Sequence, residues 1–517
     1  FHVNYYEETG DTIAGNIPKL RMNTDLSSQE LVDDCARCHS RRSQVTSWYD
    51  YSGNFLDHYD PQLITVPLYE PDGQILDEDY VWASFTQSKM YHNNISCRDC
   101  HDVHSLQLKK TGNALCLDCH ITKDYDSPAH HFHIQDTEAS QCINCHMTGR
   151  YYMGNDFRRD HSFRNPRPDQ TVLYSTPNAC NGCHNDKSAE WARDFIIEKY
   201  GPDRPKHFSD LLLKGHSGDR AALVELASDH QYPNIARASA VHYFAAGLTA
   251  DDLDELSLFL KDTSALVRKE ALNALNGTGN NFKDLISPLL KDESRIVRIA
   301  AARLFALGNI NGEGIEGYET AKQEYFDHMI LNTDFAAGQQ NLALHYEATG
   351  EMDKAIKAYK KAIAFDDYFN PARMNLALTL YRAGEVTEAE KLYLEVTEKE
   401  PDFSYSFYML GLLYNEQGDI PKALEYLHEA CTKTPHNLRA FYNYALLLQQ
   451  EEDFGQSTII ADKGLVIFPL SEELWYVKIL GQLKLGETRS ARETAKQLLK
   501  INPNRRGELE QMIGERI

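Results

Sequence analysis

The sequence predicts a mainly α-helical protein, in which an N-terminal region with little regular structure precedes a solenoid of stacked helical repeats. Three observations lead to this prediction. The motif C-x-x-C-H occurs five times before residue 185, in a stretch rich in Cys, His, Tyr, Asn and Pro that has no sustained periodicity. A repeat of 30 or 31 residues follows, and a 34-residue repeat fills the C-terminal part. The expected domains are residues 1–200, 201–310 and 319–517, with the Gly-rich stretch 308–318 as a linker.

Charge and hydropathy exclude two classes of partner. The chain of 517 residues has a formal net charge of −23 and no compact basic patch, so no nucleic acid partner is expected. No run of about 18 apolar residues occurs, so no membrane span is expected either. The chain opens with "FHVNYYEETG", without an initiator Met, a basic n-region or an apolar h-region. We expect it to be a mature chain from which a targeting segment has been removed.

Cysteine and histidine carry the chemistry of the N-terminal region. Ten of the eleven cysteines form C-x-x-C pairs, and each pair is followed directly by histidine. This is the attachment signature of c-type haem: two thioether bonds hold one porphyrin, and the histidine ligates its iron. Zinc sites do not need a histidine directly after each pair. We therefore predict five haem c groups, bound by Cys35, Cys38 and His39; Cys97, Cys100 and His101; Cys116, Cys119 and His120; Cys142, Cys145 and His146; and Cys180, Cys183 and His184. The eleventh, Cys431, is expected to be a buried apolar residue.

A second axial ligand is expected for each iron from the histidines that remain. Thirteen of the 21 histidines lie in the haem region, which favours bis-histidine irons over ligation by Met147 or Met153. His104 lies three residues after His101, at most about 10 Å away, so it should cap a neighbouring iron. From "HHFH" we favour His133, because it is nearest the following motif, and we leave His130 and His131 open. The predicted distal set is His58, His92, His104, His133 and His161, with His2 unassigned.

The repeat after the haem region aligns on arginine and alanine. The segment "SAEWARDFIIEKYG" predicts a helix closed by Gly201. Beyond it, "NIARASAVHYF", "ALVRKEALNAL" and "RIVRIAAARLF" place Arg237, Arg268 and Arg298 one period apart, as they do Ala240, Ala271 and Ala301. Asp262 and Asp292 precede two of the units, also one period apart. Paired helices with small residues at the crossing and an Asp/Arg turn resemble HEAT-type repeats, although the unit is short.

The C-terminal repeat has a period of 34 residues. Glycine, alanine and proline recur at this spacing, at Gly350, Gly384, Gly418 and Gly486; Ala355, Ala389 and Ala423; and Pro401, Pro435, Pro469 and Pro503. The unit around "YMLGLLY" carries the L-G-x-x-Y pattern and closely resembles the tetratricopeptide family. One unit cannot bury its apolar face, whereas stacked units form a continuous core. At position 452 Glu replaces the repeated Gly, so an irregular turn is expected there.

The five motifs and the "CRDCHDVH" segment resemble the superfamily of multihaem c-type cytochromes, which includes pentahaem nitrite reductases and hydroxylamine-oxidoreductase-like proteins. Within it, the chain resembles members fused to tetratricopeptide repeats, over about residues 30–200 and 320–505. The resemblance implies export, and hence a periplasmic or extracellular location. The nitrite reductases usually carry a C-x-x-C-K site at the catalytic iron, whereas all five motifs here end in His.

Three functions remain open from the sequence. The leading hypothesis is electron transfer through five low-spin haems, with the repeats docking redox partner proteins and a protein or peptide in the tetratricopeptide groove. The second is a multihaem oxidoreductase, with one open iron acting on a small nitrogen or sulfur compound. The third is a polymeric extracellular wire, a homo-oligomer in which His2 caps an iron of the next subunit.

Overall fold

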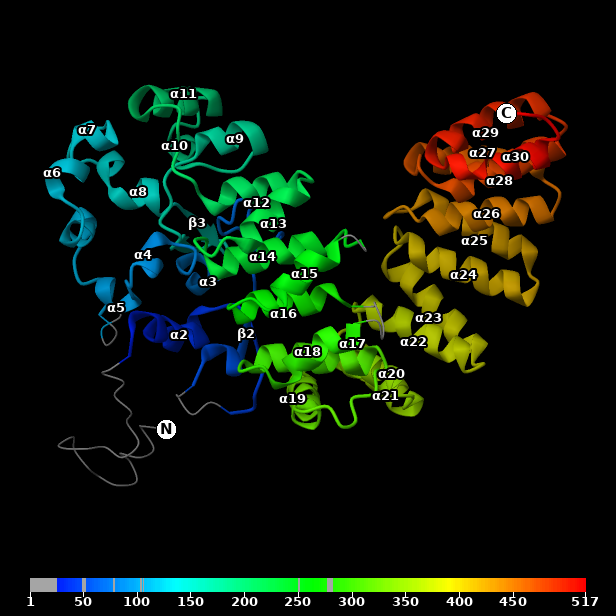
Figure 1. The fold of residues 1–517 in the computed structure, drawn as a ribbon, viewed down its shortest axis with the longest axis horizontal. Helices are drawn as coiled ribbons and strands as arrows, with labels where there is room; N and C mark the ends of the chain where they lie inside the picture. The colour runs from blue at the N-terminus through cyan, green and yellow to red at the C-terminus, as the bar shows by residue number, and fades with distance from the viewer. Residues whose placement is uncertain are drawn as a thin grey trace. The chain divides into compact units, whose positions relative to one another are not determined.

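The computed structural model describes residues 26–48, 53–77, 80–102, 105, 107–249, 252–276 and 282–517. The chain is mainly helical and divides into two compact units, Phe1–Asn332 and Thr333–Ile517 (Figure 1). Two of the histidines considered above, His2 and His104, lie outside the described residues. Among the described residues, no helix is both long and apolar enough to cross a membrane.

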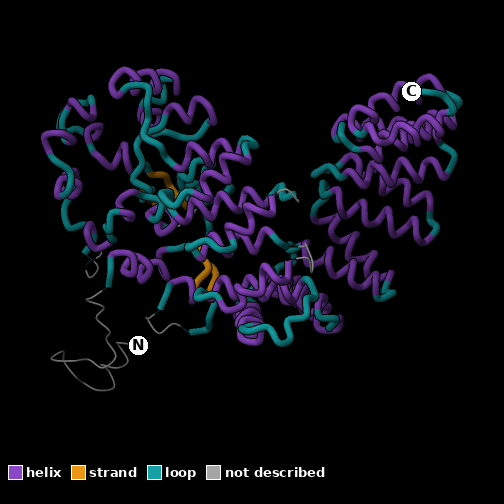
Figure 2. The backbone as a smooth tube through the Cα atoms, in the orientation of Figure 1, coloured by secondary structure: helices purple, strands orange, loops and turns teal. Residues whose placement is uncertain are grey.

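The N-terminal part of the first unit consists of short helices joined by loops, with two small antiparallel sheets (Figure 2). Strand β1 (Arg42–Gln44) pairs with β2 (Tyr59–Pro61), and β3 (Gly149–Tyr152) pairs with β4 (Asp156–Arg159). The helices are α2 (Ser28–His39), η1 (Phe55–Asp57), α3 (Val81–Phe85), α4 (Lys89–His92), α5 (Cys97–Cys100), η2 (Gly112–Asp118), α6 (Thr122–Tyr125), α7 (Pro128–His131), η3 (Glu138–Ser140), α8 (Cys142–His146), α9 (Pro168–Tyr174), α10 (Ala179–Cys183) and α11 (Ala189–Tyr200). Helix α11 ends at Gly201, as the sequence predicts.

The rest of the first unit is a stack of helices in which consecutive elements pack on one another (Figure 1). They are α12 (Phe208–His216), α13 (Arg220–Ser228), α14 (Asn234–Ala245), α15 (Leu253–Phe259), α16 (Ala265–Ala274), α17 (Lys283–Ile286), η6 (Ser287–Lys291), α18 (Arg295–Leu307) and α19 (Tyr318–Leu331). Ala240, Ala271 and Ala301, which the repeat aligns, are fully buried where α14, α16 and α18 pack together. Small side chains at these positions let the helices approach closely.

The repeated arginines form a ladder of ion pairs along this stack. Arg268 donates from Nε and Nη2 to both carboxylate oxygens of Asp292, at 2.7 and 2.8 Å. It also donates from Nη1 to the carbonyls of Asp262 and Thr263. Each arginine thus pairs with an acidic residue of the next repeat. Arg268 and Arg298 also donate to backbone carbonyls of the turn that precedes their own helix. The three pairs are Arg237–Asp262, Arg268–Asp292 and Arg298–Glu324.

The segment 53–77 lies between the first two C-x-x-C-H motifs in the sequence. It packs along helices α14, α16 and α18 of this stack. The backbone N–H of Ile64 donates to Ser239 of α14 at 3.2 Å, and Lys269 of α16 donates to Asp60 at 2.7 Å. Arg295, at the start of α18, holds both the side chain and the carbonyl of Asp57. The stack therefore supports the haem region of the same chain directly.

The second unit is a regular series of antiparallel helix pairs, each packed on the next. Its helices are α20 (Ala336–Ala348), α21 (Met352–Phe365), α22 (Asn370–Arg382), α23 (Val386–Lys399), α24 (Ser404–Gln417), α25 (Ile420–Thr432), α26 (Leu438–Gln450), α27 (Phe454–Ile467), α28 (Glu472–Lys484), α29 (Thr488–Ile501), η7 (Pro503–Arg505) and α30 (Arg506–Ile513). Ala355, Ala389 and Ala423 are fully buried. A Cβ at Gly411 would lie 2.7 Å from the Leu427 side chain, which explains the glycine of L-G-x-x-Y.

The turn at Glu452 is regular, contrary to the sequence-based expectation. Gly350, Gly384 and Gly418 have φ values of 79°, 87° and 78°, and Glu452 adopts the same left-handed conformation with φ 61°. Packing of the neighbouring helices thus imposes the turn on a residue that disfavours it. Cys431 packs at the edge of the apolar core around Phe441, and burial raises the pKa of its thiol to about 12.

Candidate haem sites

Each C-x-x-C-H motif lies on a short helical segment or at its end. Residues i and i+3 lie on one face of a helix, so one turn presents both cysteines of a pair together. The first motif ends α2, the second is α5 with His101 as its C-cap, and the third ends η2 with Cys119 as its C-cap. The fourth forms α8, and the fifth forms α10 with His184 as its C-cap. All eleven cysteines are described, and none is in a disulfide.

Local capping fixes where these turns begin. The backbone N–H and hydroxyl of Ser96 donate to Asp99, at 2.7 and 2.9 Å, in a capping box at the start of α5. The Asn178 side chain accepts from the N–H of Asn181 at 3.1 Å and caps α10. Asn113 in η2 accepts from the N–H of Cys142 at 2.9 Å, which ties the third motif to the fourth.

Consecutive motifs lie next to one another. The thiols of Cys35 and Cys97 share a hydrogen bond, which lowers the pKa of Cys35 to about 7 and raises that of Cys97. Cys116 and Cys142 form a second such pair, with the pKa of Cys142 lowered to about 7 and that of Cys116 raised.

Two further contacts complete the series. Burial, followed by repulsion from Cys180 and Cys183, raises the pKa of Cys145 to about 11. Burial also raises the pKa of Cys100, with a contribution from the charge of Cys119. Packing of the short helices agrees with these contacts, because α2 packs on α5, η2 on α8, and α8 on α10.

Two histidines of the "HHFH" segment lie opposite the motif histidines of the fourth and fifth sites. The ring centroids of His130 and His146 are 6.2 Å apart, with an angle of 10° between the ring planes. Those of His133 and His184 are 6.0 Å apart, with an angle of 28°. The sequence predicted His133 as a ligand and left His130 open. The sequence could not tell His130 from His131, because neighbouring imidazoles carry no individual signal.

His161 lies beside the first two sites. Its Nδ1 donates to the carbonyl of Arg159 at 2.9 Å. Burial lowers the pKa of His161, and the charges of His101 and His39 contribute in the same direction. Because Nδ1 of His161 is engaged in this hydrogen bond, its Nε2 is the ring nitrogen available to a metal.

His58 and His92 are also held by hydrogen bonds. His58 is buried, and its Nδ1 lies 3.2 Å from the carbonyl of Trp48 and 3.1 Å from the hydroxyl of Thr46. Burial lowers the pKa of His92, and a hydrogen bond to the backbone of Thr86 opposes this shift.

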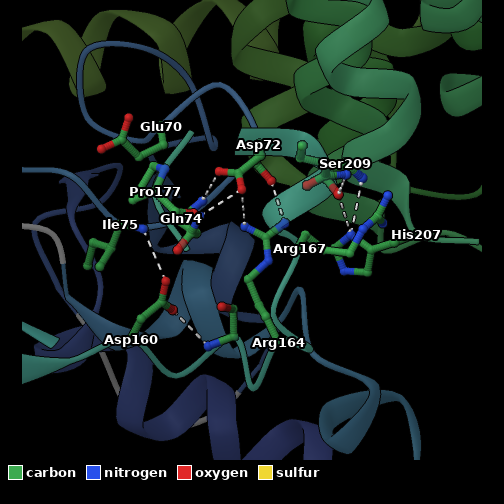
Figure 3. A network of polar contacts seen from close by, with 12 residues as sticks. Glu70, Asp72, Gln74, Ile75, Asp160, Arg164, Arg167, Pro177, His207 and Ser209 are labelled. Atoms are coloured by element: carbon green, nitrogen blue, oxygen red, sulfur yellow. Dashed lines mark hydrogen bonds and ion pairs between the residues drawn. The ribbon is translucent and has the colours of Figure 1, made fainter. Parts of the chain in front are cut away.

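A polar network around Asp72 and Arg164 (Figure 3) lies behind the histidine of the fourth motif. Nδ1 of His146 donates to the carbonyl of Arg164 at 2.9 Å, and Arg164 forms an ion pair with the buried carboxylate of Asp72 at 3.3 Å. Gln74 binds Asp72 and donates to the carbonyl of Pro177, just before the fifth motif. The network thus joins the loop 72–75 to the backbone that positions His146.

A small pocket lies beside His146 and Cys145 of the fourth motif. It is lined by Asp72, Arg164 and Arg167, among others. His146 offers Nε2, because its Nδ1 is engaged, and Cys145 offers a thiol for attachment. Nη1 of Arg167 is buried and has no hydrogen-bond partner in the described part of the chain, so it could receive a carboxylate of the porphyrin.

Comparisons with known proteins agree with both parts of the chain. A family model for a doubled CXXCH motif matches residues 91–125, and tetratricopeptide repeat models match residues 340–367 and 374–437. No curated protein matches the chain.

Several solved structures are similar to part of the chain. A crystal structure of MamA is 18% identical and covers 33% of this chain and 93% of that one, with a TM-score of 0.29. MamA from Desulfovibrio magneticus RS-1 is 15% identical over 32% of this chain and 95% of that one, with a TM-score of 0.28. YrrB, described as a TPR protein with an unusual peptide-binding site, is 17% identical over 37% of this chain and 96% of that one, with a TM-score of 0.29.

The motifs and the fold together define the class of protein. The chain carries paired CXXCH motifs, which indicate covalent binding of haem c, and it carries tetratricopeptide repeats, which are typical of protein-interaction scaffolds.

Proposed function

We propose that the protein transfers electrons along a row of five covalently bound c-type haems. The observation that carries the proposal is the contact between consecutive motifs, seen in the thiol pairs Cys35–Cys97 and Cys116–Cys142 and in the cluster of Cys145 with Cys180 and Cys183. Cofactors attached to neighbouring turns are held close together, which is what electron exchange between them requires. When bound, haem supplies reversible one-electron chemistry.

The chain's own residues fix each cofactor in place. The cysteine pairs would hold each porphyrin through two thioether bonds, and the motif histidines would ligate its iron. Arg164 and Arg159 orient His146 and His161 through their backbone carbonyls, which leaves Nε2 of each ring for iron. Arg167 would receive a porphyrin carboxylate at the fourth site. A second imidazole on each iron would leave no coordination position for a substrate and would favour a carrier over an enzyme.

The two sets of repeats have different roles in this proposal. The stack α12–α19 contacts segment 53–77 through Ser239, Lys269 and Arg295, so it serves as the support of the haem region. The tetratricopeptide unit serves to dock a redox partner protein. Because covalent haem attachment in the resembled cytochromes follows export, we place the protein in the periplasm or outside the cell.

Stoichiometric reduction of the haem-loaded full-length chain tests the proposal. With five haems found by intact mass, the chain should take up five electrons. After partial reduction by a light-activated reductant, electrons should redistribute rapidly among the sites. Cys116→Ala/Cys119→Ala removes the third site and should slow redistribution between the first two and last two sites. Cys180→Ala/Cys183→Ala removes only an end and should leave the rest unchanged. Uptake of fewer electrons than haems, or redistribution unaffected by loss of the third site, would overturn the proposal.

A further inference from the structure

The segment His130–His133 connects the fourth and fifth sites. Helix α7 ends at His131, and Phe132 follows in the left-handed conformation, with φ 57° and ψ 24°. This reversal directs His130 and His133 to different neighbours, His146 and His184 respectively. Both neighbours are motif histidines, and the helices of their motifs, α8 and α10, pack on each other.

The ring separations match those of two imidazoles on one iron. An imidazole nitrogen lies about 1 Å from its ring centroid, and its bond to a metal is about 2 Å long, so two axial rings have centroids about 6 Å apart. The observed separations are 6.2 Å for His130 with His146 and 6.0 Å for His133 with His184. The nearly parallel ring planes are consistent with two ligands on opposite faces of one porphyrin.

Hydrogen bonds separate the two ligating histidines from the third. Nδ1 of His131 accepts from the N–H of His133 at 3.2 Å, and its Nε2 donates to Gln135 at 3.2 Å, so both ring nitrogens are engaged. Nδ1 of His133 donates to the carbonyl of His131. Nδ1 of His130 lies 3.3 Å from the hydroxyl of Tyr200. His130 and His133 therefore both keep Nε2 for a metal, whereas His131 does not.

Helix α11 holds the segment in this conformation. The hydroxyl of Tyr200 donates to the carbonyl of His130 at 2.7 Å. The ring of Phe132 packs against Phe195 and Tyr200, with centroids 5.4 and 5.8 Å apart. These contacts stabilise a left-handed residue that would otherwise be unfavourable, which is expected where a particular direction of the neighbouring side chains is needed.

We propose that His130 is the second axial ligand at the fourth site and His133 the second axial ligand at the fifth. The two ligands are three residues apart, so their backbones are separated by at most about 10 Å. One short segment thus fixes the fourth and fifth irons relative to each other and provides a covalent path between them. This inference rests on the proposed function, since it assumes that both sites carry haem.

Single substitutions in the haem-loaded full-length protein test the assignment. His130→Ala and His133→Ala should each convert one haem per chain to high spin in low-temperature EPR, and the double variant two. Each reduced single variant should bind one CO per chain, and added imidazole should restore the low-spin signal. His131→Ala is the matched control and should change nothing. Low-spin spectra without CO binding in both single variants would overturn the proposal, as would conversion by His131→Ala.

Removal of a whole site shows which iron each histidine serves. In a chain lacking the fifth haem through Cys180→Ala/Cys183→Ala, His133→Ala should add no high-spin haem, whereas His130→Ala should still add one. The reverse result would overturn the assignment. Intact mass counts the attached haems in every variant. A chain without haem would contradict the proposed function itself, whereas attached haems that stay low-spin contradict only the ligand assignment.

Discussion

Nδ1 of His146 donates to the carbonyl of Arg164 at 2.9 Å, while the Arg164 side chain pairs with Asp72, whose side chain is 3% exposed. A charge pair thus reaches the imidazole of the fourth motif through the backbone between them. Such partners behind a ligand set its ring orientation and its basicity. The relationship makes Asp72 a positioning residue of the fourth site, although it does not itself touch the cofactor position.

Asp72→Asn should therefore destabilise the protein and perturb one haem. Without the carboxylate, the largely buried Arg164 is left without its charge partner, which should lower the free energy of unfolding by about 3 kcal/mol. The EPR g values of one low-spin haem should shift, because the His146 ring loses its fixed orientation. Asp77→Asn is the control: its pair with Arg41 is exposed, at 56% and 41%, and is worth less than about 1 kcal/mol. Equal effects of the two substitutions would refute this role of Asp72.

The Arg268–Asp292 pair should be a major contributor to the stability of the helical stack. Its two side chains are 8% and 7% exposed, so Asp292→Asn leaves a buried guanidinium uncompensated. The free energy of unfolding should fall by about 3 kcal/mol in chemical denaturation. Glu293→Gln provides a matched control, because Glu293 lies 3.5 Å from the same arginine but is 86% exposed. Glu293→Gln should lower the free energy of unfolding by less than about 1 kcal/mol. A larger decrease in this variant would contradict the role given to the buried pair.

Glu452→Gly should stabilise the tetratricopeptide unit. Glu452 is exposed and has φ 61°, a conformation that costs a non-glycine residue about 1 kcal/mol. Thermal unfolding of the variant should shift upward accordingly. The neighbouring Glu451 has φ −84°, so Glu451→Gly removes no strain and should stabilise nothing. Stabilisation by both substitutions would show that the left-handed backbone is not the cause.

Tyr200→Phe should loosen the segment that carries His130. The variant loses the hydrogen bond from Tyr200 to the carbonyl of His130, worth about 1 kcal/mol. The distal imidazole should dissociate more often, so CO should bind faster to one haem of the reduced protein, as followed by absorbance after rapid mixing. Tyr151→Phe, at a residue 70% exposed on the β3–β4 hairpin, is the control. An unchanged rate of CO binding in Tyr200→Phe would show that this hydrogen bond does not restrain the His130 imidazole.

Periodic features of the fold could be predicted from the sequence. Arg237, Arg268 and Arg298 recur with the helical repeat, because each has the same task of closing one turn and pairing with the next unit. The end of the ladder could not be predicted. Its last acceptor is Glu324 in α19, beyond the segment in which the repeat is visible. The docking of segment 53–77 was also not predicted, since its contacts with Ser239 and Arg295 span long stretches of sequence without any pattern.

The candidate haem sites also have one part that could be predicted from the sequence and one that could not. The cysteine pairs and their histidines are adjacent in sequence, so local chemistry identifies them. The proposed second ligands come from remote segments, and only their hydrogen bonds and ring positions distinguish them. His131 is excluded by two engaged nitrogens, and His130 is selected by its position opposite His146, neither of which sequence spacing expresses.

The central claim is that five closely spaced irons, each with two imidazole ligands, carry electrons. Low-temperature EPR of the oxidised full-length protein, loaded with five haems by intact mass, tests it most directly. The low-spin signals should integrate to five haems per chain, without a high-spin signal. A high-spin signal integrating to one haem per chain would contradict it, because that iron would have an open position suited to a substrate.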